Sequence, residues 1–454
     1  LPAPDGLSPT AWRTAALAVL MGAWWITEAL PLPATALLPV VLLPVMGILP
    51  VKAATSPYAN PLIFLFLGGF LLALAMERWN LHKRLALWIV HLSGTTPLAI
   101  IRGFMLASAF LSMWVSNTAT ALMMLPIALS VLSLMNPEGG RESGSFGVVL
   151  LLGIAYACNI GGMGTLIGTP PNALLAGFVL ENHGIEVTFV QWFSMGLPLV
   201  VIGLAAAYWI LTRLAFQVAL DDLPGAGEVI RRERNALERI QPAEVRVGLV
   251  FGAAALSWIF RPVLSGWIPG LSDAGIAVAA ALVLFLVPSG NREAPALLSW
   301  EEARRVPWGI LLLFGGGLSL SAAISQTGLA AWLAGGIEQF QGWPLLLIIF
   351  LVVTLMVFLT EMTSNTASTA TFLPILAAVA VGLGESPLLL AVPTALGASC
   401  AFMLPVATPP NAIVYGSRQV ALPQMVRAGL YLNACFIVLL SLGSVTLFQW
   451  IFGR

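Results

Sequence analysis

Long stretches without charge constrain this chain more than any other feature. Residues 344–383 contain a single charged side chain, Glu361. About 20 apolar residues are enough to span the hydrocarbon core of a bilayer as a helix. Hydrophobic residues make up 59% of the 454 residues and charged residues only 9%, whereas a soluble domain carries about 25% charge. We therefore predict an all-α protein that crosses a lipid bilayer many times.

Eight apolar stretches have roughly the length of a simple span. They cover residues 10–30, 34–50, 60–78, 188–216, 245–262, 271–288, 307–326 and 424–452. Four further stretches are interrupted. Residues 97–134 and 344–383 are too long for one crossing, and each holds a Ser-Asn-Thr (SNT) string near its middle. The strings GGMGTLIGTPPN and LPVATPPN interrupt residues 147–180 and 386–415.

The order of these features repeats along the chain. The SNT string starts at Ser116 and again at Ser364, and TPPNA starts at Thr169 and again at Thr408. LGG at 67–69 matches FGG at 314–316, and MLPIA around Pro126 matches FLPIL around Pro374. These four landmarks recur in one order at nearly one spacing, which favours an internal repeat. We predict two five-span repeats, each with a re-entrant hairpin and a broken helix. The predicted parts are residues 1–216 (hairpin 97–134, broken helix 147–180), a polar linker at 217–244, and residues 245–454 (hairpin 344–383, broken helix 386–415).

Positive charge is distributed unevenly between the two predicted sides. If residue 1 lies outside, only Arg13, Lys52, Arg261 and Arg454 fall near the outer side. Lys and Arg are enriched on the cytoplasmic side of membrane proteins. This orientation makes the two repeats inverted. We expect a multi-pass protein of the plasma (inner) membrane with a cytoplasmic linker.

The SNT and TPPN strings place uncharged polar groups at membrane depth. Non-helical backbone is tolerated there only inside protein or beside a cavity. Asn offers a carbonyl oxygen to a cation and an amide to an anion, and hydroxyls can do either. Proline frees carbonyls of the preceding turn, and helix N-termini attract anions. One string alone could be a contact between helices or a kink, but two of each in register favour a site for an anion and for sodium.

These motifs resemble those of the divalent anion–sodium symporters, the INDY-like family that carries dicarboxylates, citrate or sulfate. The matching strings are WWITEALPLPATALLP (24–39), SNTATALMMLPIA, GTPPNA, TSNTAS and FMLPVATPPNAIVYGS (402–417), and the resemblance covers essentially the whole chain. It implies a homodimer in which a fixed scaffold supports a mobile transport domain. The hairpins and broken helices would move together, like an elevator.

The resemblance also implies candidate site residues. Those for the substrate are Ser116, Asn117, Thr118, Thr169, Ser364, Asn365, Thr366 and Thr408. Those for sodium are Ser112, Ser116, Asn117 and Gly168 in one site, and Thr360, Thr363, Asn365 and Ala407 in the other. No Lys or Arg lies within ten residues of either SNT string. Co-transported sodium is thus expected to supply the positive charge that a dianion needs, without an organic cofactor.

The preferred hypothesis is a sodium-coupled symporter of a divalent organic anion, first of all a four-carbon dicarboxylate such as succinate, fumarate or malate. Citrate and sulfate stay open as substrates, and an uncoupled anion channel is the alternative of another class. Equal numbers of basic and acidic residues, 20 each, give no indication of nucleic-acid binding. His82, His91 and His183 have no metal-ligand spacing, and no nucleophile or phosphate-loop pattern indicates an enzyme. Roles for Glu361 and Arg418 are left open.

Overall fold

The structure is a computed structural model. It describes residues 3–4, 6–133, 144–218, 226–237, 239–291, 294–335 and 342–452. Some predicted features fall outside these ranges, namely residue 134 of the first hairpin, residues 219–225 and 238 of the linker, and Arg454.

The chain up to residue 218 is helical, with short connections. Its elements are α1 (Pro9–Thr27), α2 (Leu32–Thr35), α3 (Leu38–Val45), α4 (Val51–Thr55), the 3-10 helix η1 (Ser56–Ala59), α5 (Pro61–Arg78), α6 (Leu81–Ser93), α7 (Pro97–Ser112), α8 (Asn117–Ser133), α9 (Gly144–Gly162), α10 (Pro170–His183), α11 (Phe189–Trp209) and the π-helix η2 (Ile210–Ala215). Several of these helices begin at a hydroxyl or amide side chain that accepts from a backbone N–H. Ser8 caps α1, Asn60 caps α5 and Thr96 caps α7.

The second part of the chain is also mainly helical. Its helices are α12 (Ala226–Ala236), α13 (Pro242–Ile259), α14 (Arg261–Leu264), α15 (Asp273–Leu286), α16 (Trp300–Ala303), α17 (Trp308–Gln326), α18 (Leu329–Gly335), α19 (Leu345–Thr360), α20 (Asn365–Gly382), α21 (Leu388–Ala398), α22 (Pro409–Gly416), α23 (Leu422–Val445) and α24 (Leu447–Phe452). The prediction of an all-α chain misses one small feature. Strands β1 (Pro288–Asn291) and β2 (Ala294–Ala296) pair antiparallel between α15 and α16.

Within the described residues, seven helical segments are long and apolar enough to cross a membrane. They are Val51–Arg78, Gly144–Gly162, Phe189–Ala215, Pro242–Ile259, Trp308–Gln326, Asn365–Gly382 and Leu422–Phe452. The protein is therefore a multi-pass membrane protein, as predicted. Two of the expected simple spans are shorter than anticipated. Residues 34–50 are divided between α2 and the eight-residue α3, which contains Pro39 in its first turn and Pro44 next to its last residue, and residues 271–288 contain only the 14-residue α15.

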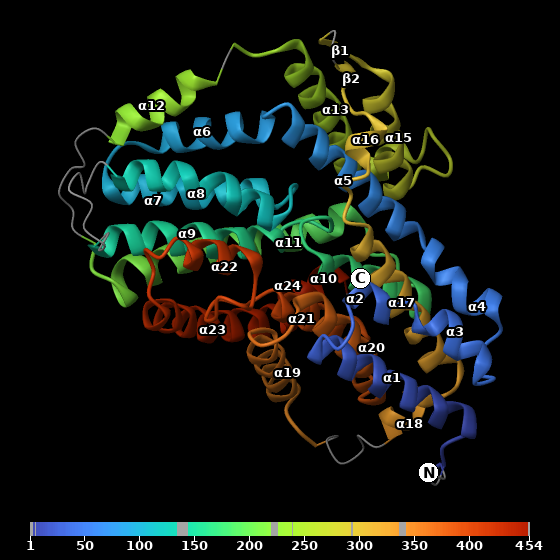
Figure 1. Ribbon diagram of the computed structural model, residues 1–454. Helices are drawn as coiled ribbons and strands as arrows, with labels where there is room; N and C mark the ends of the chain where they lie inside the picture. Colours follow the sequence, from blue (N-terminus) through green and yellow to red (C-terminus); the bar gives the residue numbers. More distant parts are fainter. Residues whose placement is uncertain are drawn as a thin grey trace.

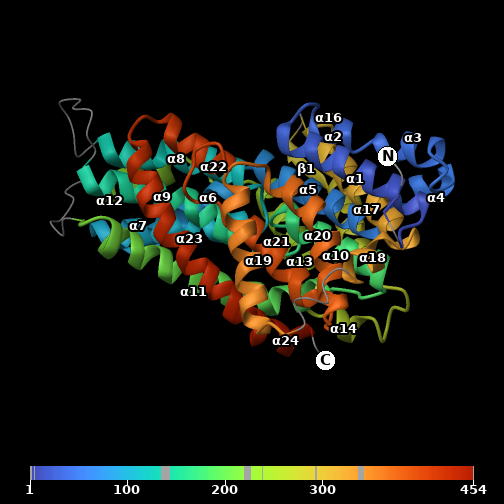
Figure 2. The same cartoon turned by 90° about the horizontal axis from the view of Figure 1, so that it is seen from below.

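The molecule is elongated in the view of Figure 2. Helices α6, α7, α8 and α12 lie toward one end, and α1, α3, α4 and α17 lie toward the other, in both views (Figures 1 and 2). The stretch predicted as a linker contains α12, which packs against α6 and α8. Its Glu233 lies 3.7 Å from the Lys83 ammonium on α6. The connection between the two parts of the chain is thus tied to the first part.

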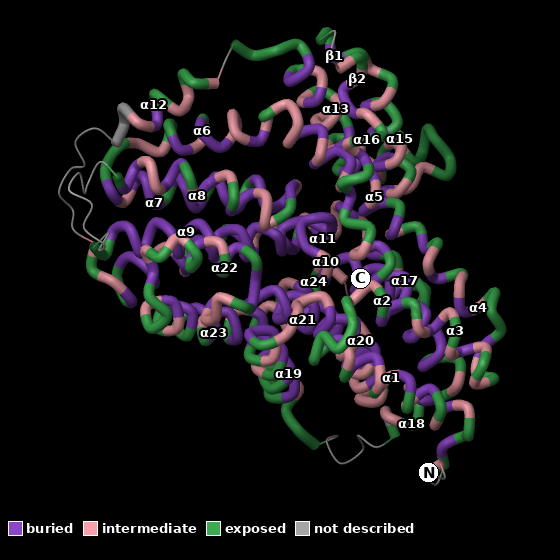
Figure 3. The backbone as a smooth tube through the Cα atoms, in the orientation of Figure 1, coloured by how far each residue is buried: buried purple, intermediate pink, exposed green. Residues whose placement is uncertain are grey.

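Two interrupted helices occupy the centre of the fold. Every residue of α21 and nearly every residue of α9 is buried, as the purple tube in Figure 3 shows. Glycines allow the close packing around them. A Cβ on Gly161 of α9 would lie 2.3 Å from the carbonyl oxygen of Ala109 on α7, and one on Gly429 of α23 would lie 2.4 Å from the Phe402 oxygen. The polar breaks of both helices are therefore enclosed by protein.

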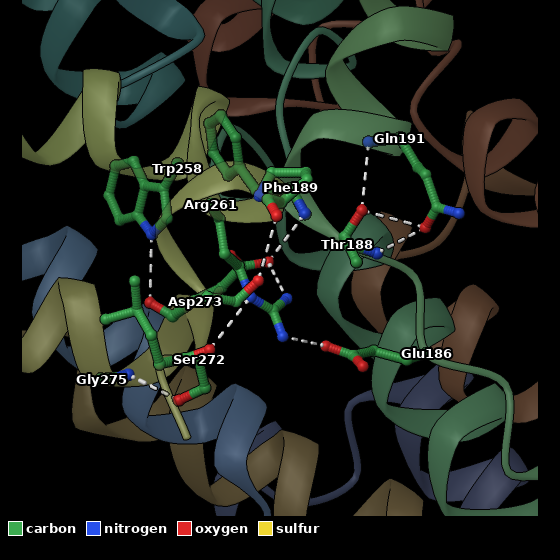
Figure 4. A network of polar contacts seen from close by, with 12 residues as sticks. Glu186, Thr188, Phe189, Gln191, Trp258, Arg261, Ser272, Asp273 and Gly275 are labelled. Carbon is green, nitrogen blue, oxygen red and sulfur yellow. Dashed lines mark hydrogen bonds and ion pairs between the residues drawn. The ribbon is translucent and has the colours of Figure 1, made fainter. Parts of the chain in front are cut away.

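A polar network around Arg261 joins α14 and α15 to the start of α11 (Figure 4). The Arg261 guanidinium lies 2.8 Å from the Glu186 carboxylate and 3.3 Å from the Asp273 carboxylate. Asp273 also accepts a hydrogen bond of 2.8 Å from the backbone N–H of Phe189. The indole of Trp258 donates to the Asp273 carbonyl. Arg261 and Asp273 together thus link the start of α15 to the start of α11, where the bonded residues Phe189 and Asp273 are 84 residues apart in sequence.

Candidate functional site

Both SNT strings lie where one helix ends and the next begins. Helix α7 ends at Ser112 and α8 starts at Asn117, while α19 ends at Thr360 and α20 starts at Asn365. Ser, Asn and Thr are weak helix formers because their side chains compete for backbone hydrogen bonds. Ser116 shows this competition, since its hydroxyl accepts from the N–H of Ala119. Each string thereby begins a helix whose N-terminus carries partial positive charge.

The two asparagines have matching surroundings. The Ser112 hydroxyl donates to Oδ1 of Asn117 at 2.6 Å, and the Thr360 hydroxyl donates to Oδ1 of Asn365 at 2.6 Å. Each donor lies five residues before its acceptor and is fully buried. These bonds hold each amide with its oxygen toward a hydroxyl oxygen. Two neutral oxygens side by side are the kind of ligand that a hard cation such as sodium prefers.

The TPPN strings form a second matched pair. The Asn172 amide donates to the carbonyls of Gly162 and Thr165 at 3.0 and 2.8 Å. The Asn411 amide donates to the carbonyls of Ala401 and Leu404, both at 3.1 Å. In each case the acceptors lie ten and seven residues earlier. Each asparagine therefore closes the non-helical segment that precedes its own helix, α10 or α22, by binding two of the backbone carbonyls of that segment or of the residue that precedes it.

The first broken helix consists of α9, the non-helical residues 163–169 and α10. It contacts the first tip, which is the turn at residues 113–116 between α7 and α8. A Cβ built on Gly162 would lie 3.0 Å from Asn117 Oδ1 and 3.3 Å from the Gly168 carbonyl oxygen. The Thr165 hydroxyl donates to the Met113 carbonyl at 2.5 Å. The candidate sodium ligands Asn117 and Gly168 therefore converge on the same glycine, and Ser112 reaches this group through Asn117.

The second broken helix consists of α21, residues 399–408 and α22. It contacts the second tip, the turn at residues 361–364 between α19 and α20, in a related way. The Thr360 hydroxyl oxygen lies 2.8 Å from the Ala398 carbonyl oxygen as well as 2.6 Å from Asn365 Oδ1, so its one proton is shared between two acceptors. Thr363 takes a different direction, because its hydroxyl lies 2.6 Å from the Ser368 hydroxyl. Ala407 is buried at the end of the non-helical segment. Thr360 and Asn365 are thus brought together, whereas in the part of the chain that the structure describes the Thr363 hydroxyl bonds to other residues than these two.

Asn159 connects the two broken helices. This buried side chain on α9 donates to the Ala401 carbonyl and to the Thr408 hydroxyl, both at 3.1 Å. Helix α22 also packs against α8 and α9, and α10 packs against α20 and α21 (Figure 1). The tip of each helix pair therefore contacts a broken helix, and the two broken helices contact each other. All four motifs belong to one polar assembly inside the fold.

Glu361 is the charged member of this assembly. Its carboxylate accepts hydrogen bonds from the backbone N–H groups of Phe402, Met403 and Leu404 at 2.8–3.0 Å. It also accepts from the Asn433 amide on α23 at 2.8 Å. The side chain is buried, with 3% exposure. Glu361 therefore fastens the α19–α20 tip to the non-helical segment of the second broken helix.

The predicted substrate residues differ in exposure. Ser116 is exposed, and Asn117, Thr118, Ser364, Asn365 and Thr366 are half-buried. Thr169 and Thr408 are buried, and Thr408 is already an acceptor for Asn159. Polar groups at both tips are thus accessible while the residues behind them are enclosed. A surface pocket lined by Glu385, Ser386 and Phe448, among others, contains none of the motif residues.

Sequence reasoning missed several members of the assembly. Asn159, Asn433 and Thr165 lie outside the repeated SNT and TPPN motifs. Asn172 and Asn411 are the last residues of the two TPPN strings, but the sequence alone indicated no role for their side chains. A signal for Asn159 and Asn433 exists, because a polar side chain in an apolar membrane helix is a candidate functional residue. Their partners could not be inferred, since the acceptors lie 72 to 252 residues away.

The family description "Sodium:sulfate symporter transmembrane region" matches residues 1–453. The chain belongs to this sodium:sulfate symporter family. Membership confirms the resemblance found in the sequence and puts the chain among membrane transporters rather than enzymes. Two curated relatives carry the name "Sodium-dependent dicarboxylate transporter SdcS". The one from Staphylococcus saprophyticus is 43% identical over 448 residues, which cover 97% of this chain and 86% of that protein. The one from Staphylococcus aureus (strain USA300) is 43% identical over 436 residues, which cover 94% and 84%.

Solved structures resemble this symporter-family chain at the level of the fold. The YdaH transporter of Alcanivorax borkumensis, described as having an unusual topology, superimposes with a TM-score of 0.62 at 17% identity, over 94% of this chain and 98% of that one. Neisseria gonorrhoeae MtrF, from a class of antimetabolite efflux pumps, gives a TM-score of 0.58 at 11% identity, over 96% and 95%. At these identities the likeness concerns the fold alone.

Proposed function

We propose that this member of the sodium:sulfate symporter family is a sodium-coupled secondary active symporter of divalent organic anions, with four-carbon dicarboxylates such as succinate, fumarate and malate as its substrates. The matched pair of asparagines carries the proposal. Each amide oxygen is held beside a buried hydroxyl at 2.6 Å, at the start of a helix. The name of relatives that are 43% identical over nearly the whole chain supports the choice of dicarboxylates and of sodium.

In this proposal, sodium is cargo and binds at two related sites. Ser112, Ser116, Asn117 and Gly168 would hold one ion, and Thr360, Thr363, Asn365 and Ala407 would hold the other. The contacts of Asn117 with Gly162 and Gly168, and the bonds of Thr360, favour this assignment most strongly. Each ion would bind hydroxyl, amide and backbone carbonyl oxygens, which suit a hard monovalent cation.

The dianion would bind between the two tips. Ser116, Asn117 and Thr118 would donate to one carboxylate, and Ser364, Asn365 and Thr366 to the other, with Thr169 and Thr408 lining the same cavity. The N-termini of α8 and α20 would add partial positive charge. The rest would come from bound sodium, because no Lys or Arg occurs near either SNT string. Sodium dependence of anion binding is therefore a physical consequence of the site.

The architecture proposed for transport is an inverted repeat, residues 1–216 and 245–454, joined by a cytoplasmic linker at 217–244. Reciprocal packing supports it, since α8 of the first part packs on α22 of the second while α10 packs on α20. The hairpins and broken helices would form a transport domain that moves against a scaffold in an elevator-like motion. A homodimer in the plasma (inner) membrane completes the proposal and derives from the family resemblance.

Uptake in proteoliposomes tests the proposal. An inward sodium gradient should drive accumulation of radiolabelled succinate, and replacing sodium by choline at constant ionic strength should abolish it. Unlabelled fumarate and malate should compete more strongly than citrate or sulfate. The family description names sulfate, so stronger competition by sulfate would reassign the substrate. Flux that follows the anion gradient equally in choline would refute coupling and indicate a channel.

A further inference from the structure

The two tips differ in one respect. Glu361 follows Thr360 directly, and its buried carboxylate accepts from four N–H groups, three of them in the backbone of residues 402–404. At the first tip, the residue that follows Ser112 is Met113, which uses its backbone carbonyl as the acceptor for Thr165. The second tip is thus held to its broken helix by a charged carboxylate, whereas the first tip is held to its broken helix by a neutral backbone carbonyl.

The charge of Glu361 has no basic partner. Among the described residues, no Lys, Arg or His side chain forms an ion pair with it, since the pairs found involve other acids. Four N–H donors satisfy its oxygens without cancelling its formal charge. The Thr360 hydroxyl beside it bonds to Asn365 Oδ1, so the charge lies one residue from a candidate sodium ligand.

A fixed carboxylate in this position attracts a cation and repels a dianion. At an effective dielectric constant of about 20, one charge at a separation on the order of 10 Å changes cation affinity by roughly tenfold. Since Met113 supplies no such charge at the first tip, the two sodium sites are electrically unequal. Sodium at the second site would also cancel the repulsion between Glu361 and the substrate.

We propose that Glu361 is a positioning residue whose charge makes the second sodium site bind sodium more strongly than the first. This inference depends on the proposed function for the existence of the sodium sites. Glu361 does not touch substrate in this arrangement. It acts through the segment 402–404 that it holds, and through its field on the cation beside Thr360 and Asn365.

Three variants separate charge from hydrogen bonding. Glu361→Gln removes the charge. It also replaces one of the two carboxylate oxygens, both of which accept hydrogen bonds, by an NH2 group that cannot accept one. Glu361→Asp keeps the charge on an arm that is one methylene shorter. Asn433→Ala keeps the carboxylate but removes one of its donors. The purified full-length chain is titrated with sodium at constant ionic strength, without substrate, and the midpoint of its thermal stabilisation is measured. Succinate affinity is then measured in sodium and in choline.

Glu361→Gln should raise the sodium midpoint about tenfold and narrow the ratio between succinate affinities in sodium and in choline. Glu361→Asp and Asn433→Ala should unfold at lower temperature, yet keep the midpoint within about twofold because the charge remains. An unchanged midpoint in Glu361→Gln, or a tenfold shift in either charged variant, overturns the inference. If Glu361→Gln does not fold, Glu361→Met takes its place, because it removes the charge and copies the residue that follows Ser112 at the first tip; it should give the same rise of the midpoint, and an unchanged midpoint overturns the inference. A wild-type protein that sodium does not stabilise refutes the proposed function itself.

Discussion

Replacing Gly162 by Ala should damage the first sodium site while leaving the fold intact. The added Cβ would lie 3.0 Å from Oδ1 and 3.1 Å from Nδ2 of Asn117, closer than ordinary van der Waals contact, so the carboxamide must retreat by a few tenths of an ångström. The retreat would change the 2.6 Å bond with Ser112 and the direction of Oδ1. It would also press on the Gly168 carbonyl at 3.3 Å.

The two consequences differ in size. Overpacking costs about 1–3 kcal/mol, and replacing a helical glycine by alanine recovers about 0.5–1 kcal/mol, so the net loss of folding stability lies between about 0 and 2.5 kcal/mol. Misplacing one charged-ligand interaction costs about 1.5–3 kcal/mol, which corresponds to roughly a 10- to 100-fold weaker sodium affinity. The loss of sodium binding energy should therefore exceed the loss of folding stability by about 1 kcal/mol.

The measurement is the sodium midpoint of thermal stabilisation, together with sodium-driven succinate uptake. Gly252→Ala in α13 is the matched control, because no heavy atom lies within 4 Å of its added Cβ. The control should keep the wild-type midpoint. If Gly162→Ala shares that midpoint within twofold and transports normally, Asn117 and Gly168 do not form a sodium site beside Gly162.

Three further predictions concern other parts of the assembly. Asn117→Ala and Asn365→Ala should each abolish sodium-driven uptake and leave the unfolding temperature nearly unchanged. If either variant keeps the wild-type uptake rate at low sodium, that asparagine does not belong to the site. Asn411→Leu removes two hydrogen bonds, but the Ala401 carbonyl keeps the Asn159 amide and the Leu404 carbonyl keeps the Ala407 N–H as donors. Each lost bond should cost about 0.5–1.5 kcal/mol. Asn411→Leu should therefore lower the unfolding temperature more than Asn182→Ala, which loses one bond to the preceding turn; equal effects would contradict the bracing role of Asn411. Arg261→Gln leaves the buried Asp273 without its cation and should lower the free energy of unfolding by about 3 kcal/mol. Glu186→Gln changes a half-exposed carboxylate and should lower the free energy of unfolding by less than about 1 kcal/mol. A lower unfolding temperature for Glu186→Gln than for Arg261→Gln would refute this account of the network.

Local physics let the sequence predict where the helices stop. The apolar lengths determined the membrane class, and the weak helix propensity of SNT together with the prolines of TPPN located the interruptions near residues 113–116, 163–169, 361–364 and 399–408. These features depend on a few neighbouring residues, so they can be recognised without a fold. The same reasoning was less accurate for residues 34–50 and 271–288, because apolar composition does not reveal how much of a stretch remains helical.

Only the tertiary structure decided which polar groups meet. Asn159 reaches Thr408 across 249 residues, Asn433 reaches Glu361 across 72, and Arg261 joins Glu186 to Asp273. A sequence identifies each of these side chains as polar in an apolar setting, but any of them could have bonded to its own helix. The packing of α22 on α8 and of α10 on α20 selects the partners. Because a buried polar group must find a partner inside the protein, the arrangement of the helices determines the chemistry of the site.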